Sequence, residues 1–342
     1  MRPIDLAEKG LVPDWLIRRG IRALLRRRLE DERIDDPEAQ SQRYQALIDE
    51  LAQSAIAIEA DAANEQHYEI PAIFYQHVLG RRLKYSSALW APGVEDLDEA
   101  ETAMLEQTCR NAELADGQKI LELGCGWGSL TLWMACHYPT SRITAVSNSS
   151  SQRQHIESRA RALGLGNVEV ITRDVNELSL DGRFDRVVSV EMFEHVRNYR
   201  QLLARIAGWM RPEARLFVHI FCHRFLAYPF EAKGEDNWMG RHFFTGGLMP
   251  AADTLLHFAD DVVIEHRRLY SGEHYAKTAR AWLENLDEHS HEVRSVMQTV
   301  YGDEAALWQR RWRIFFMACE ELFGFDRGRQ WLVGHFRFRK RE

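Results

Sequence analysis

The feature that most constrains the fold is a glycine-rich turn, Glu122-Leu123-Gly124-Cys125-Gly126-Trp127-Gly128. It follows the apolar run Ile120-Leu121 and precedes a helix predicted over Ser129 to Tyr138. Glycines at such a strand-to-helix junction let the backbone approach a ligand closely. A dinucleotide-binding turn prefers G-x-G-x-x-G, whereas this turn has the pattern G-x-G-x-G after an acidic residue. The spacing therefore favours a different cofactor, and a tight turn without a ligand is the alternative.

Downstream of this turn, predicted strands alternate with predicted helices. The strands are expected at Ile143 to Val146, Val168 to Thr172, Phe184–Val190 and Arg215–Phe221, with helices over Gln152–Leu163 and Tyr199–Met210. Two later runs, Val262–His266 and Phe336–Arg339, are expected to form edge strands. This alternation predicts an α/β, Rossmann-like, doubly wound fold with a seven-stranded, mostly parallel sheet.

The predicted core has helical additions at both ends of the chain. Residues 1–80 are expected to form a helical N-terminal extension, and residues 81–342 the core, with helical insertions at about 224–256 and 278–325. Within the extension, apolar residues from Trp15 to Leu29 recur at helical spacing between six arginines. Such a basic amphipathic helix can lie on an anionic lipid surface, but a solvated face on a core-packed helix is the commoner arrangement.

Composition excludes several classes of protein. A 342-residue chain with 45% hydrophobic and 28% charged residues is typical of a globular enzyme, and the net charge of -7 makes nucleic acid an unfavourable partner. Five cysteines without CxxC spacing suggest a reducing, cytoplasmic location and argue against a disulfide framework or a metal site. No apolar run approaches the ~20 residues that span a bilayer, so any lipid contact is expected to be peripheral.

Polar residues after the next two predicted strands complete a candidate cofactor site. Asn148 and Gln152, in the run Ser147 to Gln152, can hydrogen-bond a ribose or an amino acid tail, although helix capping alone explains the serines. Asp174 follows the third strand, where a carboxylate can accept a hydrogen bond from an adenine amino group, and a surface turn is the alternative. With Glu122 before the glycines, this arrangement is typical of methyltransferases that use S-adenosylmethionine.

The fourth predicted strand ends in Val190-Glu191-Met192-Phe193-Glu194-His195-Val196. Two carboxylates and an imidazole are thus expected at the carboxyl edge of the sheet, where open α/β sheets bind ligands. Glu191 and His195 share one face if the segment is helical, and the carboxylates attract a cationic amine and raise the basicity of the histidine. A histidine or glutamate poised there can remove the proton of an ammonium group. A helix N-terminus enriched in acids is the alternative.

The chain resembles the cyclopropane fatty acid synthase superfamily of methyltransferases, and more closely its coclaurine N-methyltransferase-like branch. The resemblance covers nearly the whole chain. It rests on Val12-Pro13-Asp14-Trp15-Leu16, Asn64-Glu65-Gln66-His67-Tyr68-Glu69-Ile70-Pro71, Leu83-Lys84-Tyr85-Ser86, Leu121 to Gly126, Glu191 to Val196, Phe221-Cys222-His223 and Glu235-Asp236-Asn237-Trp238.

The resemblance implies a class I methyltransferase fold with S-adenosylmethionine as cofactor and S-adenosylhomocysteine as product. The candidate cofactor residues are Tyr85, Ser86, Glu122, Gly124, Gly126, Asn148, Gln152, Asp174, Val175 and Val190. The candidate catalytic residues, facing the acceptor, are Glu191, Glu194 and His195. The candidate acceptor pocket contains Tyr68, Trp238, Phe244, Tyr275, Trp312 and Cys319. Cys319 matches a family cysteine once proposed as catalytic, although a cysteine on an apolar helix is usually a small buried hydrophobe.

Departures from the lipid-modifying members separate two functions. Those members resemble one another in a Tyr-Ser-Cys segment, a glycine at the position of Glu191 and a bicarbonate that acts as base, whereas this chain has Ser87 and Glu191. The added carboxylate favours a cationic acceptor, so we expect an N-methyltransferase of a small, aromatic or alicyclic amine. Modification of unsaturated acyl chains in phospholipids is the alternative, and a non-catalytic binding module is a third. The oligomeric state stays open, with a homodimer as one option.

Overall fold

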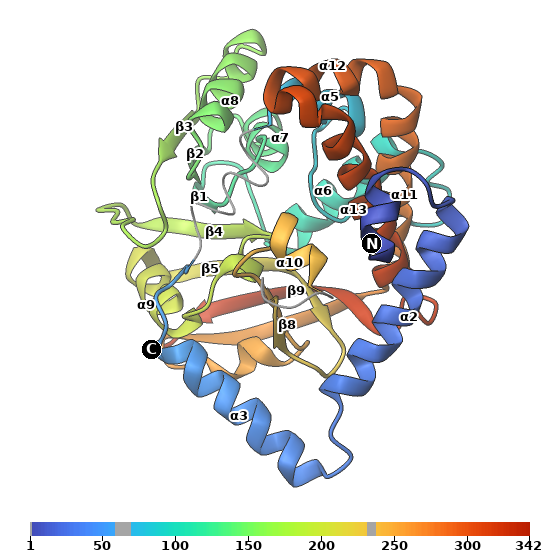
Figure 1. Cartoon of the computed structure of the whole chain (residues 1–342). Helices are drawn as coiled ribbons and strands as arrows, with labels where there is room; N and C mark the ends of the chain where they lie inside the picture. The colour runs from blue at the N-terminus through green and yellow to red at the C-terminus, as the bar shows by residue number, and fades with distance from the viewer. Residues whose placement is uncertain (1, 59–69, 231–236) are drawn as a thin grey trace.

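The computed structural model describes residues 2–58, 70–230 and 237–342, and its centre is a seven-stranded sheet in the order β3-β2-β1-β4-β5-β9-β8 (Figure 1). The first five strands in the chain are parallel, and the last two pair antiparallel beside β5. The parallel strands are β1 (Lys119–Leu123), β2 (Arg142–Ser147), β3 (Val168–Thr172), β4 (Phe184–Val190) and β5 (Met210–His223). The antiparallel strands are β8 (Val262–Tyr270) and β9 (Trp331–Lys340). The predicted fold class is confirmed.

Helices cover both faces of the sheet, which explains the nearly continuous apolar runs in its central strands. On one face, α6 (Leu97–Asn111) and α7 (Ser129–His137) pack against β1 and β4. On the other face, α9 (Tyr199–Trp209) packs in one apolar cluster with residues of these strands, and α3 (Pro37–Gln53) packs against α9. The next helix, α8 (Ser150–Ala162), links β2 to β3 and contacts both strands.

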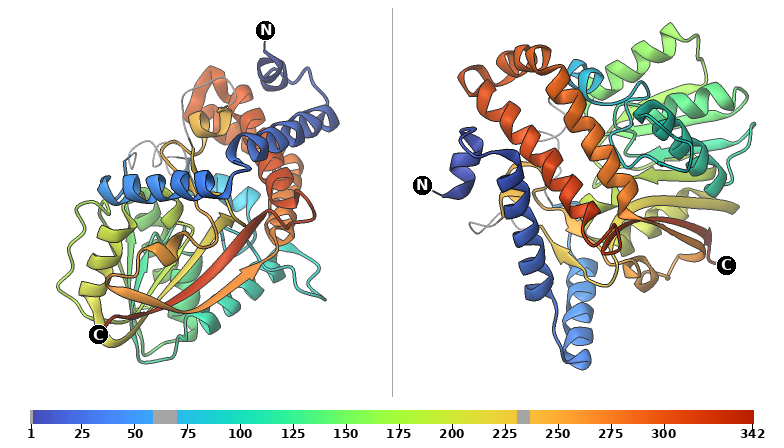
Figure 2. Two further views of the ribbon diagram at one scale, coloured as in Figure 1. Left: turned by 90° about the horizontal axis from the view of Figure 1, so that it is seen from below. Right: turned by 90° about the vertical axis from the view of Figure 1, so that its right-hand side faces the viewer.

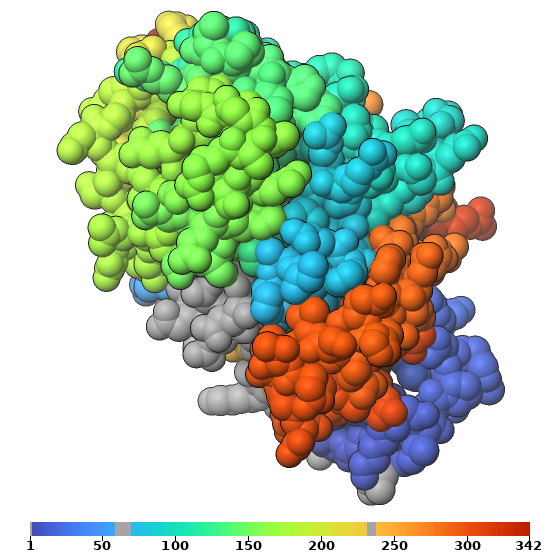
Figure 3. All heavy atoms as spheres, turned by 90° about the horizontal axis from the view of Figure 1, so that it is seen from above, coloured from blue at the N-terminus to red at the C-terminus, as the bar shows by residue number. Residues whose placement is uncertain are grey.

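A helical cap stands beside this sandwich and is rich in buried aromatic residues (Figures 1 and 2). Its members are α1 (Pro3–Glu8), α2 (Asp14–Glu32), α5 (Ala72–Val78), α11 (Gly272–Glu288), α12 (Ser290–Tyr301) and α13 (Ala305–Gly324), with the short η3 (Gly302–Glu304) before α13. Helix α5 contacts both α8 and α12, and it lies between them on the surface in Figure 3. The cap is therefore joined to the sheet domain through α5, and also through α11 and α13, which contact β9.

The arginine-rich helix is packed against this cap. Arg18 of α2 forms ion pairs with Glu320 at 2.7 Å and Glu321 at 3.0 Å, both on α13, and Arg22 pairs with Glu321 at 2.8 Å. These contacts match the core-packed arrangement considered for this helix. In the ranges that the structure describes, no helix is both long and apolar enough to span a bilayer.

Two expectations about the later part of the chain were wrong. The run Phe336–Arg339 belongs to β9, which is no edge strand because it lies between β5 and β8. Local periodicity identifies a strand but does not specify its neighbours. The segment 224–256 is mostly not helical where described, since it contains β6 (Tyr228–Pro229), α10 (Trp238–His242), β7 (Leu248–Met249) and η2 (Thr254–His257). Its aromatic residues contribute to a loop layer over the sheet.

Candidate active site

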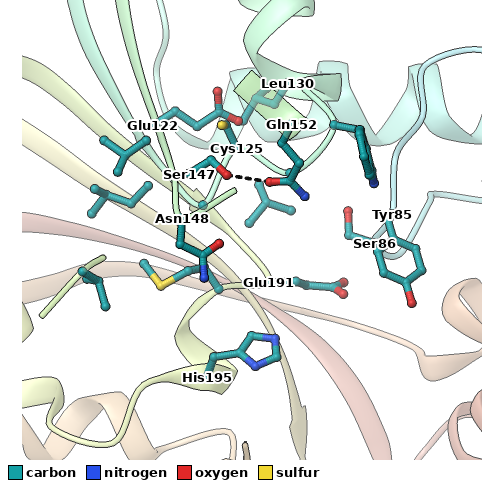
Figure 4. A pocket seen from close by; sticks show the side chains of 18 of the residues that line it. Tyr85, Ser86, Glu122, Cys125, Leu130, Ser147, Asn148, Gln152, Glu191 and His195 are labelled. Carbon is teal, nitrogen blue, oxygen red and sulfur yellow. Dashed lines mark hydrogen bonds between the residues drawn. The ribbon is translucent and has the colours of Figure 1, made fainter. Parts of the chain in front are cut away.

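A cavity opens at the carboxyl ends of β1, β2 and β4, as expected for an open α/β sheet (Figure 4). It encloses about 1350 Å³ of space, its open mouth included. All ten candidate cofactor residues line it, together with Glu191 and His195 of the candidate catalytic set. The structure thus brings together side chains from four strand ends and from the Tyr85-Ser86 segment.

The glycine-rich turn forms one wall of this cavity. Gly124 and Gly128 adopt φ values of +79° and +83°. A Cβ at Gly124 would lie 2.7 Å from Met192 Cβ, and one at Gly128 would lie 2.6 Å from Ile156 Cγ1. A Cβ at Gly126 would meet no described atom within 4 Å. Two glycines are therefore required by packing, whereas the third leaves space for a ligand at the turn.

The cavity contains buried hydrogen-bond donors without a partner, and these can be compared with the acceptor groups of S-adenosylmethionine. Several buried polar atoms of cavity residues have no hydrogen-bond partner among the residues described. They include Gln152 Nε2, Trp127 Nε1 and Ser129 Oγ. Ser147 Oγ donates to Gln152 Oε1 at 2.6 Å, which fixes the amide and leaves its Nε2 for a ligand. A buried donor left unpaired costs ~1–3 kcal/mol. A ligand rich in acceptors, with a carboxylate and ribose hydroxyls, fits this donor set.

Two acidic side chains of the cavity supply acceptors. Glu122 is buried and accepts from Thr131 Oγ1 at 2.5 Å, and burial raises the pKa of its carboxyl to about 8. Asp174 Oδ1 accepts from the backbone N–H of Asn176 at 2.7 Å. The arrangement places one acidic group beneath the glycine-rich turn and another after β3, as the sequence predicted.

Sequence reasoning missed Lys84 as a cavity residue. Its ammonium group is buried and donates to Ser86 Oγ at 2.5 Å and to Ser87 O at 2.7 Å. Burial lowers the pKa of Lys84 to about 8, against the opposing effect of Glu191 and Glu101. The available signal was its place next to Tyr85-Ser86. Trp127, Thr245 and Gly246 also line the cavity without having been predicted.

The carboxylate of Glu191 is held by three groups. Its Oε1 accepts from Ser87 N at 2.9 Å and lies 3.1 Å from His219 Nε2, while its Oε2 accepts from Tyr275 Oη at 2.6 Å. Burial raises the pKa of Glu191, and nearby Lys84 opposes that rise. The backbone at Glu191 has φ +48°, in the left-handed region that disfavours side chains. The placement of this carboxylate in the cavity wall therefore requires a strained backbone conformation at Glu191.

The other two candidate catalytic residues differ in position. His195 lines the cavity, and its ring stacks on Phe244 with centroids 4.7 Å apart and an interplanar angle of 23°. Glu194 is fully buried, and its Oε1 accepts from Phe221 N at 2.7 Å. Burial, with Glu191 nearby, raises the pKa of Glu194 well above its ordinary value. Among the described lining residues, the cavity includes Glu191 and His195 but not Glu194.

The segment from Glu191 to His195 is not a continuous helix, so the condition under which Glu191 and His195 would share a helix face is not met. Only Phe193–His195 forms a short 3-10 helix, and Glu191 precedes it in the left-handed conformation. Glu191 and His195 reach the same cavity because the chain turns sharply after β4, not because they share a helix face.

Of the candidate acceptor residues that the structure describes, none lines the cavity itself. Tyr275 and Phe244 contact the cavity side chains Glu191 and His195, as given above. Trp312 packs against Phe74 and Phe243, with ring centroids 4.8 and 5.0 Å apart. Trp238 donates to Glu8 Oε1 at 2.8 Å, and burial raises the pKa of the Cys319 thiol. Tyr68 lies outside the described residues.

Comparison with known proteins gives consistent matches over almost the full chain. A family model for mycolic acid cyclopropane synthetase matches residues 57–329. (S)-Coclaurine N-methyltransferase of Thalictrum flavum subsp. glaucum is 38% identical over 339 residues, covering 98% of this chain and 94% of that protein. Its namesake in Papaver somniferum is 35% identical over 338 residues, covering 98% and 96%.

A solved structure is also similar to this chain over almost its full length. The crystal structure of coclaurine N-methyltransferase bound to N-methylheliamine and SAH has a TM-score of 0.95 to this chain, at 36% identity, and covers 98% of both chains. These matches confirm the resemblance that the sequence motifs indicated.

Proposed function

This chain belongs to the mycolic acid cyclopropane synthetase family, and we propose that within it the protein methylates the nitrogen of a small aromatic or alicyclic amine. The observation that carries this proposal is the Glu191 carboxylate, which lies in the cavity wall beside His195. A fixed carboxylate next to an imidazole suits an acceptor that arrives as a cation and must lose a proton before it reacts. One related enzyme is named for coclaurine, and the related crystal structure contains N-methylheliamine, which supports an acceptor of the coclaurine or heliamine kind.

The residues of the segment after β4 have different roles in the proposed reaction. We assign to Glu191 the attraction and orientation of the ammonium group, and to His195 the removal of its proton, directly or through one water molecule. The nitrogen lone pair freed in this way forms the new N–C bond as the C–S bond breaks. Phe244 keeps the imidazole of His195 in place by stacking on it. Glu194 is buried and accepts from Phe221 N, so it acts by holding the turn after β4 against β5.

The cofactor residues bind and align the methyl donor. Bound S-adenosylmethionine supplies the methyl group together with its own leaving group. Tyr85 and Ser86 hold the methionine end, Gln152 and Asn148 face the ribose, and Asp174 accepts from the adenine amino group. Because direct transfer requires alignment of three atoms, these residues act by fixing position.

Two observations weigh against acyl chains as the acceptor. The carboxylate of Glu191 puts a charged, hydrogen-bonded group where an acyl chain would need an apolar wall. The arginines Arg18 and Arg22, which gave the sequence argument for lipid contact, form ion pairs with α13. We therefore place the amine first.

We also propose that the protein works in the cytoplasm on a freely diffusing amine. All five cysteines are free thiols in the structure, as a reducing compartment requires. The net charge of -7 attracts a cationic acceptor over a longer range.

The test is methyl transfer from labelled S-adenosylmethionine by the purified protein. One arm uses a panel of primary and secondary arylalkyl and cyclic amines, and the other uses liposomes with unsaturated acyl chains. Label in an amine product supports the proposal, with secondary cyclic amines expected to react fastest. Label in lipid alone would contradict it and would favour cyclopropane-type chemistry.

A further inference from the structure

Two buried histidines lie in line behind Glu191. His219 of β5 and His335 of β9 are 0% and 1% exposed, and the register of the two strands pairs them directly. Nε2 of His219 lies 3.1 Å from Glu191 Oε1, and Nδ1 of His219 lies 2.9 Å from His335 Nε2. Nδ1 of His335 lies 2.7 Å from Asn111 Nδ2, at the end of α6. A continuous chain of hydrogen bonds thus leads from the cavity to the C-terminal end of α6, which covers one face of the sheet.

The orientation of Asn111 decides which way the protons of this chain point. Its Oδ1 accepts from Gln107 Nε2 at 2.8 Å, and its Nδ2 also donates to Tyr270 Oη at 3.0 Å. The amide group therefore presents a donor to His335 Nδ1. A neutral imidazole carries one N–H and one bare nitrogen. His335 must then donate through Nε2 to His219 Nδ1, which leaves the N–H of His219 on Nε2, facing Glu191.

Both imidazoles are kept neutral by their surroundings. Burial lowers the pKa of His219 well below its ordinary value, and Lys84 adds to this effect. Burial also lowers the pKa of His335 well below its ordinary value, with His219 and Lys84 contributing. If both imidazoles were protonated, two N–H groups would face each other across the 2.9 Å contact. The neutral donor chain is the arrangement in which every one of these nitrogens has a suitable partner.

We propose that Asn111, His335 and His219 form a one-way chain of donors that holds the Glu191 carboxylate ionised and in one orientation toward the amine. This inference rests on the N-methyltransferase function proposed above. His219, His335 and Asn111 are positioning residues, because they act through Glu191. The chain is no exit for the substrate proton, since each N–H points toward Glu191 and Asn111 offers a donor at the outer end.

The first experiment reads the tautomers without any need for activity. Protein labelled with ¹⁵N-histidine is studied by NMR at neutral pH, and His219→Gln and His335→Gln assign the two rings. The expected result is a neutral ring with the proton on Nε2 at both positions. A proton on Nδ1, or an imidazolium, at either position would overturn the proposed chain, whatever the substrate of the enzyme is.

The second experiment compares His335→Gln with His335→Leu. The glutamine amide can donate from about the position of the imidazole Nε2, whereas leucine cannot donate. We expect His335→Leu to lower kcat about 2–10-fold, because it removes a hydrogen bond between two neutral imidazoles, which contributes ~0.5–1.5 kcal/mol. We expect His335→Gln to retain most of kcat, and both variants to keep the wild-type affinity for S-adenosylmethionine within about twofold.

The pH profile separates positioning from packing. Glu191 is faced by Lys84, His195, Tyr275, Glu194 and Cys319, and none of these groups is altered in the variants. In His335→Leu the tautomer of His219 is no longer fixed, so its N–H can leave Nε2. Loss of that donor raises the pKa of Glu191, so the acid limb of kcat/KM must move to higher pH. Equal loss in both variants, or an unshifted limb in His335→Leu, would refute the positioning role.

Two further variants keep the test decisive. Asn111→Leu removes the outer donor at a half-buried position, and it is expected to shift the acid limb in the same direction even if His335→Leu does not fold. His223→Leu is the matched control, because His223 is buried on the same strand but its Nδ1 accepts from Phe225 N and Leu226 N. It should leave the acid limb unmoved. If wild-type protein methylates no amine, the proposed function fails, while the tautomer measurement still decides the donor chain.

Discussion

The hydroxyl of Tyr275 donates to Oε2 of Glu191 at 2.6 Å, and this bond joins α11 of the cap to the end of β4 in the sheet. The ring of Tyr275 stacks on Phe323 of α13 with centroids 4.2 Å apart. The orientation of the central carboxylate is therefore set from the cap as well as from the sheet. Any change in how the cap docks must change the geometry of Glu191.

Tyr275→Phe isolates this contact, because the phenyl ring keeps the stacking on Phe323. We expect kcat to fall about tenfold, since a hydrogen bond to a charged group contributes ~1.5–3 kcal/mol. The pKa of Glu191 rises when a donor is lost, so the acid limb of the rate profile moves to higher pH. Tyr228→Phe, a buried tyrosine that accepts from Trp331 Nε1, is the control and should keep the wild-type profile. An identical profile in both variants would contradict the assignment.

His195→Ala tests proton removal. If His195 is the general base, turnover falls by about 10²–10⁴ while the affinity for S-adenosylmethionine, measured by calorimetry, stays unchanged. His291→Ala, at an exposed position on α12, is the control for a general effect of losing a histidine. Wild-type turnover in His195→Ala would remove this residue from the role.

Asp174→Ala tests the contact with the adenine. We expect the dissociation constant of S-adenosylmethionine to rise about 10–100-fold, which corresponds to the loss of a hydrogen bond to a charged group. Glu177→Ala removes an exposed carboxylate three residues along and should bind normally. Equal affinities in a titration of the two variants would refute the adenine assignment.

Glu191→Gly and Glu191→Ala are both expected to raise the KM of the amine, since both lack the carboxylate that attracts the cation. Their stabilities should differ, because the backbone at Glu191 has φ +48°. A left-handed conformation costs a side-chain-bearing residue about 1–2 kcal/mol, while glycine costs about 0.5–1 kcal/mol in chain entropy. Glu191→Gly should therefore be the more stable by about 0.5–1 kcal/mol in urea unfolding. Greater stability of the alanine variant would show that the strain is absent.

Glu122→Gln tests the effect of pH on stability without cofactor. The folded pKa of Glu122, about 8, lies above the ordinary value of 4.5, so the folded state binds the proton more tightly. The resulting stabilisation is complete below the unfolded value and is lost as pH rises through the folded one. Between these values the free energy of unfolding should fall more steeply with pH in the wild type than in Glu122→Gln. Parallel curves for the two proteins would contradict the raised pKa of Glu122. Glu101 and Lys84 titrate in both proteins, so their contributions cancel in the comparison.

Much of the fold could be predicted because strands and helices follow from local patterns of apolar residues and glycines. The strands from β1 to β4 lie where apolar runs predicted them, and Gly124 and Gly126 line the cavity at the carboxyl edge of the sheet. The relation of Glu191 to His195 could not be predicted, since it depends on one left-handed residue that sequence periodicity does not report.

Contacts between residues that are distant in the chain could not be predicted from the sequence either. His219 and His335 are brought together by the pairing of β5 with β9, which no local pattern specifies. The one available signal was a histidine inside each apolar strand, a polar group that must find a buried partner. For Lys84 the signal was adjacency to Tyr85, and for Trp238 the bond to Glu8 is a contact that only the folded structure reveals.

The insertion of β9 between β5 and β8 has a consequence for synthesis of the protein. A ribosome completes β5 and β8 well before β9, so the nascent chain carries β5 with one unpaired edge and β8 without its partner. Unpaired edges are prone to pair with other chains. The last strand of the sheet to be made both protects those edges and delivers His335 behind Glu191, so maturation of the site and protection from aggregation are completed in the same step.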